Sequence, residues 1–396
     1  MALDIGVARI AYGTVLPALR RDLDLTFFAG GALAAANLAA YLAGTLAAPR
    51  LGRVLPMAAL ARWGHGAFAF GALATGLAPD TATFALGRVL TGLGAGIGLL
   101  ALFVVVFELT ARELRPVVSA AVWSGIGVAI VASGLSAPLL LGQAGAWRWV
   151  FGVSALLAVV VAWEVGRISP AAGVAAETPV PTMPPSEMPD PWSGSAWLGL
   201  FGAYFMFGVG YIAYSTFVGG RLAAANAGMA TIVASWVSLG LGSIAGSVLG
   251  AAVLWSRRWK PFALVLASLA GAGGSAAAIE AGPIGPMVGA VMVGLGLAST
   301  PAIVTAFVRE RTSDLDYARV FSMATAALGV GQLIGPLIAG ALADRIGPGA
   351  VMVFAAGAYS AGAALAAADL RVRRLQAGPV ATGVSSREPH SAQDPS

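Results

Sequence analysis

Long apolar runs separated by short polar connections dominate this chain. Twelve runs can be marked, and each is about long enough to cross the roughly 30 Å hydrocarbon layer of a membrane as a tilted helix. We expect them at residues 1–19, 28–48, 56–77, 82–107, 117–141, 148–165, 196–218, 228–254, 262–281, 284–308, 320–343 and 349–368. Lipid demands a backbone that satisfies its own hydrogen bonds, which favours helices over strands here. The pattern therefore predicts an all-α polytopic membrane protein with twelve transmembrane helices.

The two halves of the pattern repeat each other. Three short matches recur in the same order at offsets of 202, 200 and 198: Ile10-Ala-Tyr-Gly-Thr14 with Ile212-Ala-Tyr-Ser-Thr216, Gly94-Ala-Gly96 with Gly294-Leu-Gly296, and Ala137-Pro-Leu-Leu-Leu-Gly142 with Gly335-Pro-Leu-Ile-Ala-Gly340. They indicate two pseudo-symmetric six-helix bundles. We expect these bundles at 1–165 and 196–370, with a cytoplasmic linker at 166–195 and a disordered cytoplasmic tail at 371–396.

Composition agrees with a membrane protein and argues against other classes. Hydrophobic residues make up 58% of the chain and charged residues only 10%, against about 25% charged in an average soluble domain. The absence of cysteine excludes thiolate metal sites, and two histidines leave little for a histidine site, so we expect no metal and no cofactor. The first run has no basic leader, which favours a retained helix over a signal peptide.

The positive charges report orientation. With both termini placed inside, the inner connections hold fifteen of the Lys and Arg residues and the outer connections five. This positive-inside bias predicts a multi-pass protein of the bacterial cytoplasmic (inner) membrane with both termini cytoplasmic. It also accounts for the basic pI near 10.0 through contact with anionic lipid, so no nucleic-acid partner is needed.

Arg9 stands out because it lies inside the first apolar run. Counted from Met1, it is roughly 12 Å into the hydrocarbon layer, where a guanidinium costs several kcal/mol unless it faces a partner or a polar cavity. Two interpretations remain open. Arg9 either bonds carbonyls of a neighbouring helix as a structural residue, or it serves substrate binding or gating.

The repeat suggests what could face Arg9. Tyr12 lies three residues after Arg9 on the same helix face, and the 202 offset makes Tyr211 and Tyr214 their counterparts. A cavity between the halves would then be positive on one wall and aromatic-polar on the other. An organic anion suits it, because an arginine fork holds a carboxylate, sulfonate or phosphonate through two hydrogen bonds. Ordinary helix packing is the alternative for the tyrosines.

The twelve-helix layout and the repeated Gly-Pro helices resemble the major facilitator superfamily. Gly6-Val-Ala-Arg9-Ile-Ala-Tyr12 before Leu16-Pro17, Asn37-Leu-Ala-Ala-Tyr41-Leu-Ala-Gly44 and Gly210-Tyr-Ile-Ala-Tyr-Ser-Thr-Phe217 resemble its poorly characterised YbfB/YjiJ branch. The resemblance implies a monomeric secondary transporter, in which the halves alternately expose a site between them.

Two superfamily motifs can be carried over. Arg88-Val-Leu-Thr-Gly92-Leu-Gly94-Ala-Gly96 resembles the motif of the fourth helix, whose arginine is assigned to coupling or gating. A structural bond to a neighbour's carbonyls is the alternative for Arg88. Gly44-Thr-Leu-Ala-Ala-Pro-Arg50-Leu-Gly52-Arg53 resembles the loop motif Gly-x-x-x-Asp-Arg-x-Gly-Arg but lacks its aspartate. We therefore expect Arg50 and Arg53 to lie at an inner gate whose closing contacts differ from those that the aspartate makes in the superfamily.

Coupling to a proton requires a titratable group, and no carboxylate falls clearly at the midplane. Asp4 is the best candidate, yet five residues at 100° each turn it about 140° away from Arg9 in an α-helix. Coupling could use Asp4 with another helix, a counter-anion, or no ion at all. Arg62 and His65 are expected to be structural.

The remaining candidates are polar or helix-distorting residues within the apolar runs. Asn37, Tyr41 and Gln332 could line the cavity, Gly92 and Gly96 suit close helix packing, and Pro138, Gly335 and Pro336 suit packing or hinges.

The sequence thus favours a secondary transporter that moves a small anionic organic solute by alternating access, with a co-transported proton or a counter-anion as the possible partner. The alternatives are an efflux pump for hydrophobic or cationic compounds, drugs or sugars, a non-transporting sensor, and an integral-membrane enzyme. An enzyme would require clustered ligands or a nucleophile with its base, whereas the acids here are scattered and peripheral.

Overall fold

The computed structural model describes residues 1–167, 197–256, 258–280, 282–312 and 314–376, and these form helices without strands. The first half contains η1 (Ala2–Ile10), α1 (Ala11–Asp22), α2 (Phe27–Leu51), α3 (Met57–Leu77), α4 (Thr81–Leu109), α5 (Arg115–Gly142) and α6 (Arg148–Arg167). The second half contains α7 (Leu198–Ala224), α8 (Met229–Trp255), α9 (Ala263–Ala277), α10 (Ile284–Arg311), α11 (Asp314–Ile346) and α12 (Gly349–Gln376). Two short 3-10 helices, η2 (Arg112–Leu114) and η4 (Lys260–Phe262), precede α5 and α9.

All twelve expected segments are present as helices, if η1 and α1 are counted as one. Ten of them, in the described part of the chain, are long and apolar enough to cross a membrane. The other two are α3, which carries Arg62, Trp63 and His65, and α9, which has 15 residues. The prediction of an all-helical, twelve-helix membrane fold is confirmed.

The second bundle and the linker end near the limits of the described residues. The helix α12 runs to Gln376 and so extends past residue 370, where the second bundle is expected to end. The expected linker at 166–195 lies, from residue 168 onward, outside the described residues, as does the chain after Gln376.

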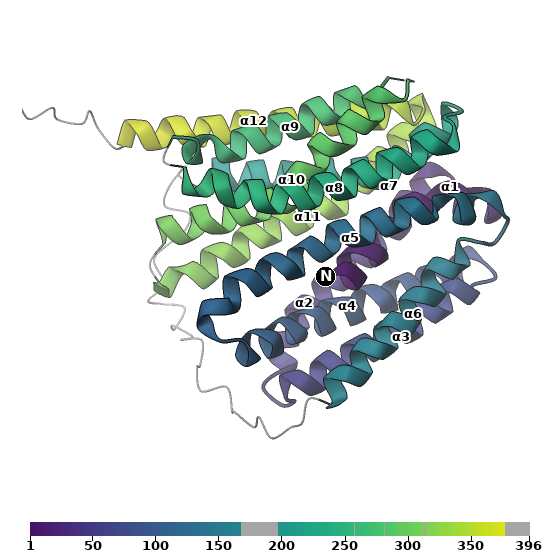
Figure 1. The fold of residues 1–396 in the computed structure, drawn as a ribbon, viewed down its shortest axis with the longest axis horizontal. Helices are drawn as coiled ribbons and strands as arrows, with labels where there is room; N and C mark the ends of the chain where they lie inside the picture. Colours follow the sequence, from purple (N-terminus) through teal and green to yellow (C-terminus); the bar gives the residue numbers. More distant parts are fainter. Residues whose placement is uncertain (168–196, 257, 281, 313, 377–396) are drawn as a thin grey trace, which may run out of the picture.

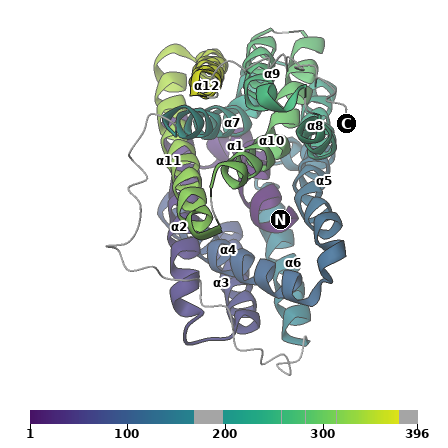
Figure 2. The same ribbon diagram turned by 90° about the vertical axis from the view of Figure 1, so that its left-hand side faces the viewer.

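The helices form two six-helix bundles. Within the first, α4 packs on α2 and α3, and α3 packs on α6; within the second, α10 packs on α8 and α9, while α12 packs on α7 and α9. Figures 1 and 2 show α3 and α6 on one side of the molecule and α9 and α12 on the opposite side. The bundles meet through α1 with α7, α2 with α11 and α5 with α8.

Glycines allow the bundles to approach closely at these contacts. We call the end at which α6 finishes and α7 begins the linker end, and the opposite end, where α1 meets α2, the far end. The inter-bundle glycine contacts lie in the middle and far parts of the helices: Gly13 with Ser215, Gly31 with Pro336, Gly127 with Gly240, Gly134 with Trp236, and Gly340 with Phe28. The two bundles are therefore sealed together toward the far end.

Candidate functional site

The first membrane segment begins as a π-helix. In η1 the hydrogen bonds run from residue i to i+5, as in the bond from the Ala11 amide to the Gly6 carbonyl, and α-helical geometry starts only at Ala11. Residues five apart therefore lie about one turn apart on the same side. This corrects the expected angle of about 140° between Asp4 and Arg9, which assumed an α-helix. The two side chains nevertheless turn to different partners.

Arg9 lies between the bundles and is almost fully buried. Its guanidinium carbon stacks 3.6 Å from the ring centroid of Tyr41 on α2, and the same side chain interacts with the Tyr211 hydroxyl on α7. Its Nη2 is buried without a hydrogen-bond partner among the described residues. An unsatisfied guanidinium nitrogen is costly in an apolar interior, so Nη2 is an atom of this site whose hydrogen-bonding capacity is unused.

On the side of the second bundle, Gln332 of α11 orients Tyr211 in this site. Its Nε2 donates a 2.6 Å hydrogen bond to the Tyr211 hydroxyl, and both side chains are buried. Tyr211 also stacks on Phe207, one turn earlier on α7, with ring centroids 4.9 Å apart. The structure thus brings together four of the expected residues, Arg9, Tyr41, Tyr211 and Gln332, which we call the anchor cluster. It contains two residues from each bundle.

Tyr12 does not join the anchor cluster. Its hydroxyl donates a 2.9 Å hydrogen bond to the Gly30 carbonyl, and its ring lies 4.7 Å from the guanidinium carbon of Arg88. The expectation that Arg9 and Tyr12 share one face is not met, because the change from π- to α-helix between them rotates the later residue. Tyr12 packs α1 against α2 and α4.

Arg88 braces the π-helical segment from α4. Its Nη1 donates a 2.6 Å hydrogen bond to the Ala8 carbonyl, next to Arg9. Asn37 in turn donates to the Arg88 carbonyl at 2.8 Å and to the Thr91 hydroxyl at 3.2 Å. Asn37 and Arg88 therefore use these hydrogen bonds for contacts between helices. The bond from Arg88 to the Ala8 carbonyl holds the backbone next to Arg9.

Tyr214 is fully buried in the core that spans both bundles, and its hydroxyl has no partner among the described residues. It lies near Tyr359 of α12, whose ring also presses on Gly210 and Gly271. Unlike Tyr211, it belongs to the packing between α7 and its neighbours, away from Arg9.

Asp4 pairs with a residue that sequence reasoning treated as structural. Its Oδ1 lies 3.4 Å from Nε2 of His65 on α3, and its Oδ2 lies 3.5 Å from the Met1 ammonium. Both side chains are buried, Asp4 at 2% and His65 at 1% exposure. The only hint in the sequence was a histidine inside an apolar run.

A second residue that sequence reasoning missed is Asp344, at the far end of α11. Its two carboxylate oxygens accept 2.8 Å hydrogen bonds from the backbone amides of Phe27 and Phe28, the first residues of α2 in the other bundle. The sequence carries a signal: Gly340-Ala-Leu-Ala-Asp344-Arg-Ile-Gly347 matches the first eight positions of the pattern Gly-x-x-x-Asp-Arg-x-Gly-Arg expected between the second and third helices, and Pro348 replaces the final arginine. Asp344 caps α2 across the bundle interface.

The expected gate and packing residues occupy the following places. Arg50 and Arg53 are exposed at the linker end, where Arg50 donates to the Leu46 carbonyl of its own helix. Gly92 and Gly96 lie against the carbonyls of Asn37 and Tyr41, which sets the spacing of α4 and α2. Pro138 is exposed on α5, whereas Gly335 and Pro336 are buried, against Val209 of α7 and Gly31 of α2 respectively.

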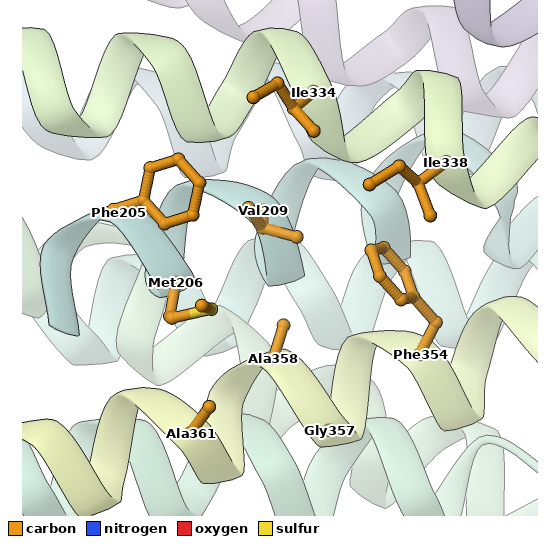
Figure 3. Close-up of a pocket in the computed structure, with 9 residues that line it drawn as sticks. All are labelled: Phe205, Met206, Val209, Ile334, Ile338, Phe354, Gly357, Ala358 and Ala361. Carbon is orange, nitrogen blue, oxygen red and sulfur yellow. The ribbon is translucent and has the colours of Figure 1, made fainter. Parts of the chain in front are cut away.

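A separate hollow on the second bundle is apolar throughout. It has a volume of about 380 Å³ and is lined only by apolar groups of α7, α11 and α12, among them Phe205, Ile338 and Phe354 (Figure 3). Nothing in its lining could hold a charge, so it is not a candidate anion site. No group of three or more potential metal-binding side chains occurs among the described residues.

Comparison with known proteins agrees with the fold. A family model described as "Uncharacterised MFS-type transporter YbfB" matches residues 1–370. Among solved structures, the crystal structure of a point mutant of the nucleoside transporter NupG superimposes with a TM-score of 0.71, over 93% of this chain and 98% of that one. The two sequences are only 13% identical, so this likeness shows the fold alone. A search of curated protein sequences gives no match. The chain therefore belongs to the major facilitator superfamily, in the family of the uncharacterised transporter YbfB.

Proposed function

We propose that this protein is a secondary transporter of a small organic anion, which binds at Arg9 between the two bundles and crosses by alternating access. The observation that carries the proposal is the buried Nη2 of Arg9, which has no hydrogen-bond partner among the described residues. Membership of a transporter family makes the protein a transporter and not an enzyme.

The surroundings of Arg9 favour an anion with an organic body. The guanidinium stacks on Tyr41 with one face, which leaves its edge available to a planar acceptor such as a carboxylate or sulfonate. Tyr211 stands beside it and is oriented by the Gln332 amide, so it can donate its hydroxyl proton to the same ligand. The aromatic rings of Tyr41 and Phe207 supply apolar surface for the remainder of the solute.

Alternating access is supported by where the bundles touch. Their glycine contacts and the Asp344 cap on α2 lie toward the far end. A transporter sealed at one end presents its site to the other end, here the linker end. The inner and outer counts of Lys and Arg support a cytoplasmic linker end, an inner-membrane location and cytoplasmic termini. We further propose bundles at 1–165 and 196–370 that move as units about the linker at 166–195, and a monomer.

An efflux pump for cationic drugs is the main rival, and it predicts a buried acid in the central site. The anchor cluster contains none, and Asp4 is turned to His65. The charge at the bundle interface is thus positive, which favours an anion over a cation.

Purified protein in proteoliposomes tests the proposal. We expect uptake of radiolabelled benzenesulfonate or ethanesulfonate above protein-free vesicles, competition by other organic anions, and no competition by organic cations. A sulfonate keeps its charge at all working pH values, which prevents leakage of a neutral acid. Uptake of cations in preference to anions, or of neither, would contradict the proposal.

A further inference from the structure

Asp4 of η1 and His65 of α3 form a buried acid–imidazole pair outside the anchor cluster. Asp4 Oδ1 and His65 Nε2 are 3.4 Å apart, and neither atom has another partner among the described residues. The pair is bordered by the apolar cluster that contains Leu3, Phe68 and Ala69. An unneutralised charge is costly in such surroundings, so the Asp4 carboxylate needs positive charge or a proton from its two neighbours, the imidazole at Oδ1 and the Met1 ammonium at Oδ2.

The neighbouring carbonyl fixes the orientation of the imidazole. His65 Nδ1 lies 2.8 Å from the carbonyl oxygen of Ala61, which can only accept, so Nδ1 carries a hydrogen. Nε2 then faces the Asp4 carboxylate either as a lone pair or as an N–H group. Two lone pairs would repel each other, whereas one proton placed between Nε2 and Oδ1 joins them. The geometry is that of a site for one proton.

Other charged groups near this site are few or face elsewhere. The Met1 ammonium lies 3.5 Å from the second Asp4 oxygen. Arg88 of α4 is directed to Ala8 and Arg9 to Tyr41. Further charges on the elements packed against the pair are held away from it: Arg62 of α3 over Trp63, Glu164 with Arg167 on the surface of α6, Arg21 with Asp22 at the far end of α1, Arg20 at Leu25, and Arg221 of α7 at Ile279.

The π-helix links this site to the anion site. Asp4 and Arg9 are five residues apart, about one turn in a helix with i to i+5 bonds. A negative charge delivered to Arg9 stabilises a proton one turn away, because charges interact strongly in the poorly polarisable interior. By linkage, the proton raises the affinity for the anion by the same factor.

We propose that Asp4 and His65 form a one-proton site that couples proton movement to the movement of the anion bound at Arg9. This inference rests on the proposed function. One proton from the side to which the site is open enters between Nε2 and Oδ1, travels with one anion, and leaves to the other side after the bundles have moved. No bond of the solute changes, and a monovalent anion with one proton crosses without net charge.

The first test needs no substrate. His65 is one of two histidines, so His390→Asn leaves it as the only one, and its ring nitrogens can be followed by ¹⁵N NMR in nanodiscs. Between pH 4.5 and 9 we expect a single protonation change of His65, displaced by at least about one pH unit in Asp4→Asn, since a partner charge at this distance shifts titration by 1–3 units. The exposed carboxylate variant Glu164→Gln serves as the matched control and leaves the change in place.

Two results would overturn the inference: a His65 ring that keeps one protonation state over the whole range, or a titration that Asp4→Asn leaves unaltered. A short Gly-Ser extension before Met1 moves the ammonium away from Asp4, so the effect of Asp4 on His65 can be measured without it. The displacement caused by Asp4→Asn must persist in this extended protein, and its loss would assign the effect to the ammonium instead.

The second test measures coupling in proteoliposomes with benzenesulfonate as the probe. A proton gradient of one pH unit, acid on the entry side, should drive about tenfold accumulation for one proton per anion. Asp4→Asn and His65→Gln should lose this accumulation and retain benzenesulfonate exchange, which shows that they are folded and bind the anion. Equal accumulation with and without the gradient in the wild type would overturn coupling while leaving anion transport intact. Absence of any sulfonate uptake would refute the proposed function, and the titration would still decide the proton site.

Discussion

Gly13 of α1 and Ser215 of α7 touch across the interface between the bundles, so closely that a Cβ atom on Gly13 would overlap the Ser215 carbonyl oxygen. The two positions are equivalent in the internal repeat, since 215 − 13 gives the offset of 202 that relates the first and seventh helices. Equivalent positions meet only at the pseudo-symmetry axis. The contact between Gly13 and Ser215 therefore lies on this axis, and from there toward the far end the two bundles are closed against each other.

Enlarging Gly13 should therefore open the far end. Gly13→Val would disfavour the sealed state, because the added atoms meet backbone that cannot rotate away. The chain has no native cysteine, so the state can be followed through a single Phe217→Cys label; Phe217 is buried and packs on Phe27 across the interface. We expect maleimide labelling at least about tenfold faster in Gly13→Val, equivalent to about 1.4 kcal/mol. Gly66→Val, at a glycine with open space around it, is the control and should label at the parent rate.

Removing the Asp344 cap should act in the same direction. Asp344→Ala deprives the amides of Phe27 and Phe28 of their acceptors, and an N-cap is worth roughly 0.5–2 kcal/mol, which corresponds to about 2- to 30-fold faster labelling. Asp80→Ala removes a comparable cap, on Thr83 of α4, within one bundle. An equal effect of both substitutions would show that Asp344 acts on helix stability alone and not on the interface.

The hydrogen bond between Gln332 and Tyr211 should orient the anion site. Gln332→Leu and Tyr211→Phe each remove one partner, and we expect each to raise the dissociation constant for benzenesulfonate about 3- to 10-fold, as for a hydrogen bond of about 1 kcal/mol. The double variant should be little worse than Tyr211→Phe alone, because the Gln332 amide acts on the ligand through the Tyr211 hydroxyl that this substitution already removes. Additive losses in isothermal titration calorimetry would place the two residues at separate points of the ligand.

The ion pair between Arg311 of α10 and Asp369 of α12 should stabilise the second bundle without serving transport. Two hydrogen bonds of 3.0 and 2.8 Å join the partners, and Asp369 is almost fully buried. Arg311→Gln removes both of these hydrogen bonds from the buried carboxylate and should cost about 3–5 kcal/mol, whereas Arg311→Gln with Asp369→Asn should cost less than either single change. Thermal unfolding in detergent measures both. A double variant less stable than each single variant would contradict this account.

Much of the fold follows from the apolar pattern. Helices such as α2 and α4 lie within a few residues of their expected bounds, because lipid leaves a long apolar run no alternative to a helix. The π-helix of η1 did not follow, since π- and α-helices draw on similar residues and the difference depends on distant partners. Gly6 packs against Ala129 of α5, and Arg88 of α4 takes the Ala8 carbonyl. Contacts between residues so far apart in the chain cannot be predicted from the local sequence.

The contacts of the anchor cluster were predictable in part, because an apolar helix restricts where its polar side chains can lie. The repeat placed Tyr211 opposite Arg9, and the polar residues Tyr41 and Gln332 had few roles open to them in an apolar helix. Tyr12 lies on another surface than its spacing predicts, because 100° per residue does not hold through a segment that is partly π-helical. The partner of Asp4 could not be derived, because the register between η1 and α3 is a property of the packed bundle.

Binding of benzenesulfonate to purified variants of Arg9 tests the central claim most directly. Arg9→Gln should weaken binding at least about 30-fold, since a buried charge-assisted contact is worth about 2 kcal/mol or more, and Arg9→Lys should fall between, because it keeps the charge and loses the planar fork. Arg62→Gln, which removes an exposed arginine of α3, is the control and should bind as the wild type does. Thermal unfolding without ligand establishes that each variant is folded. Equal affinity of Arg9→Gln and the wild type would contradict the account.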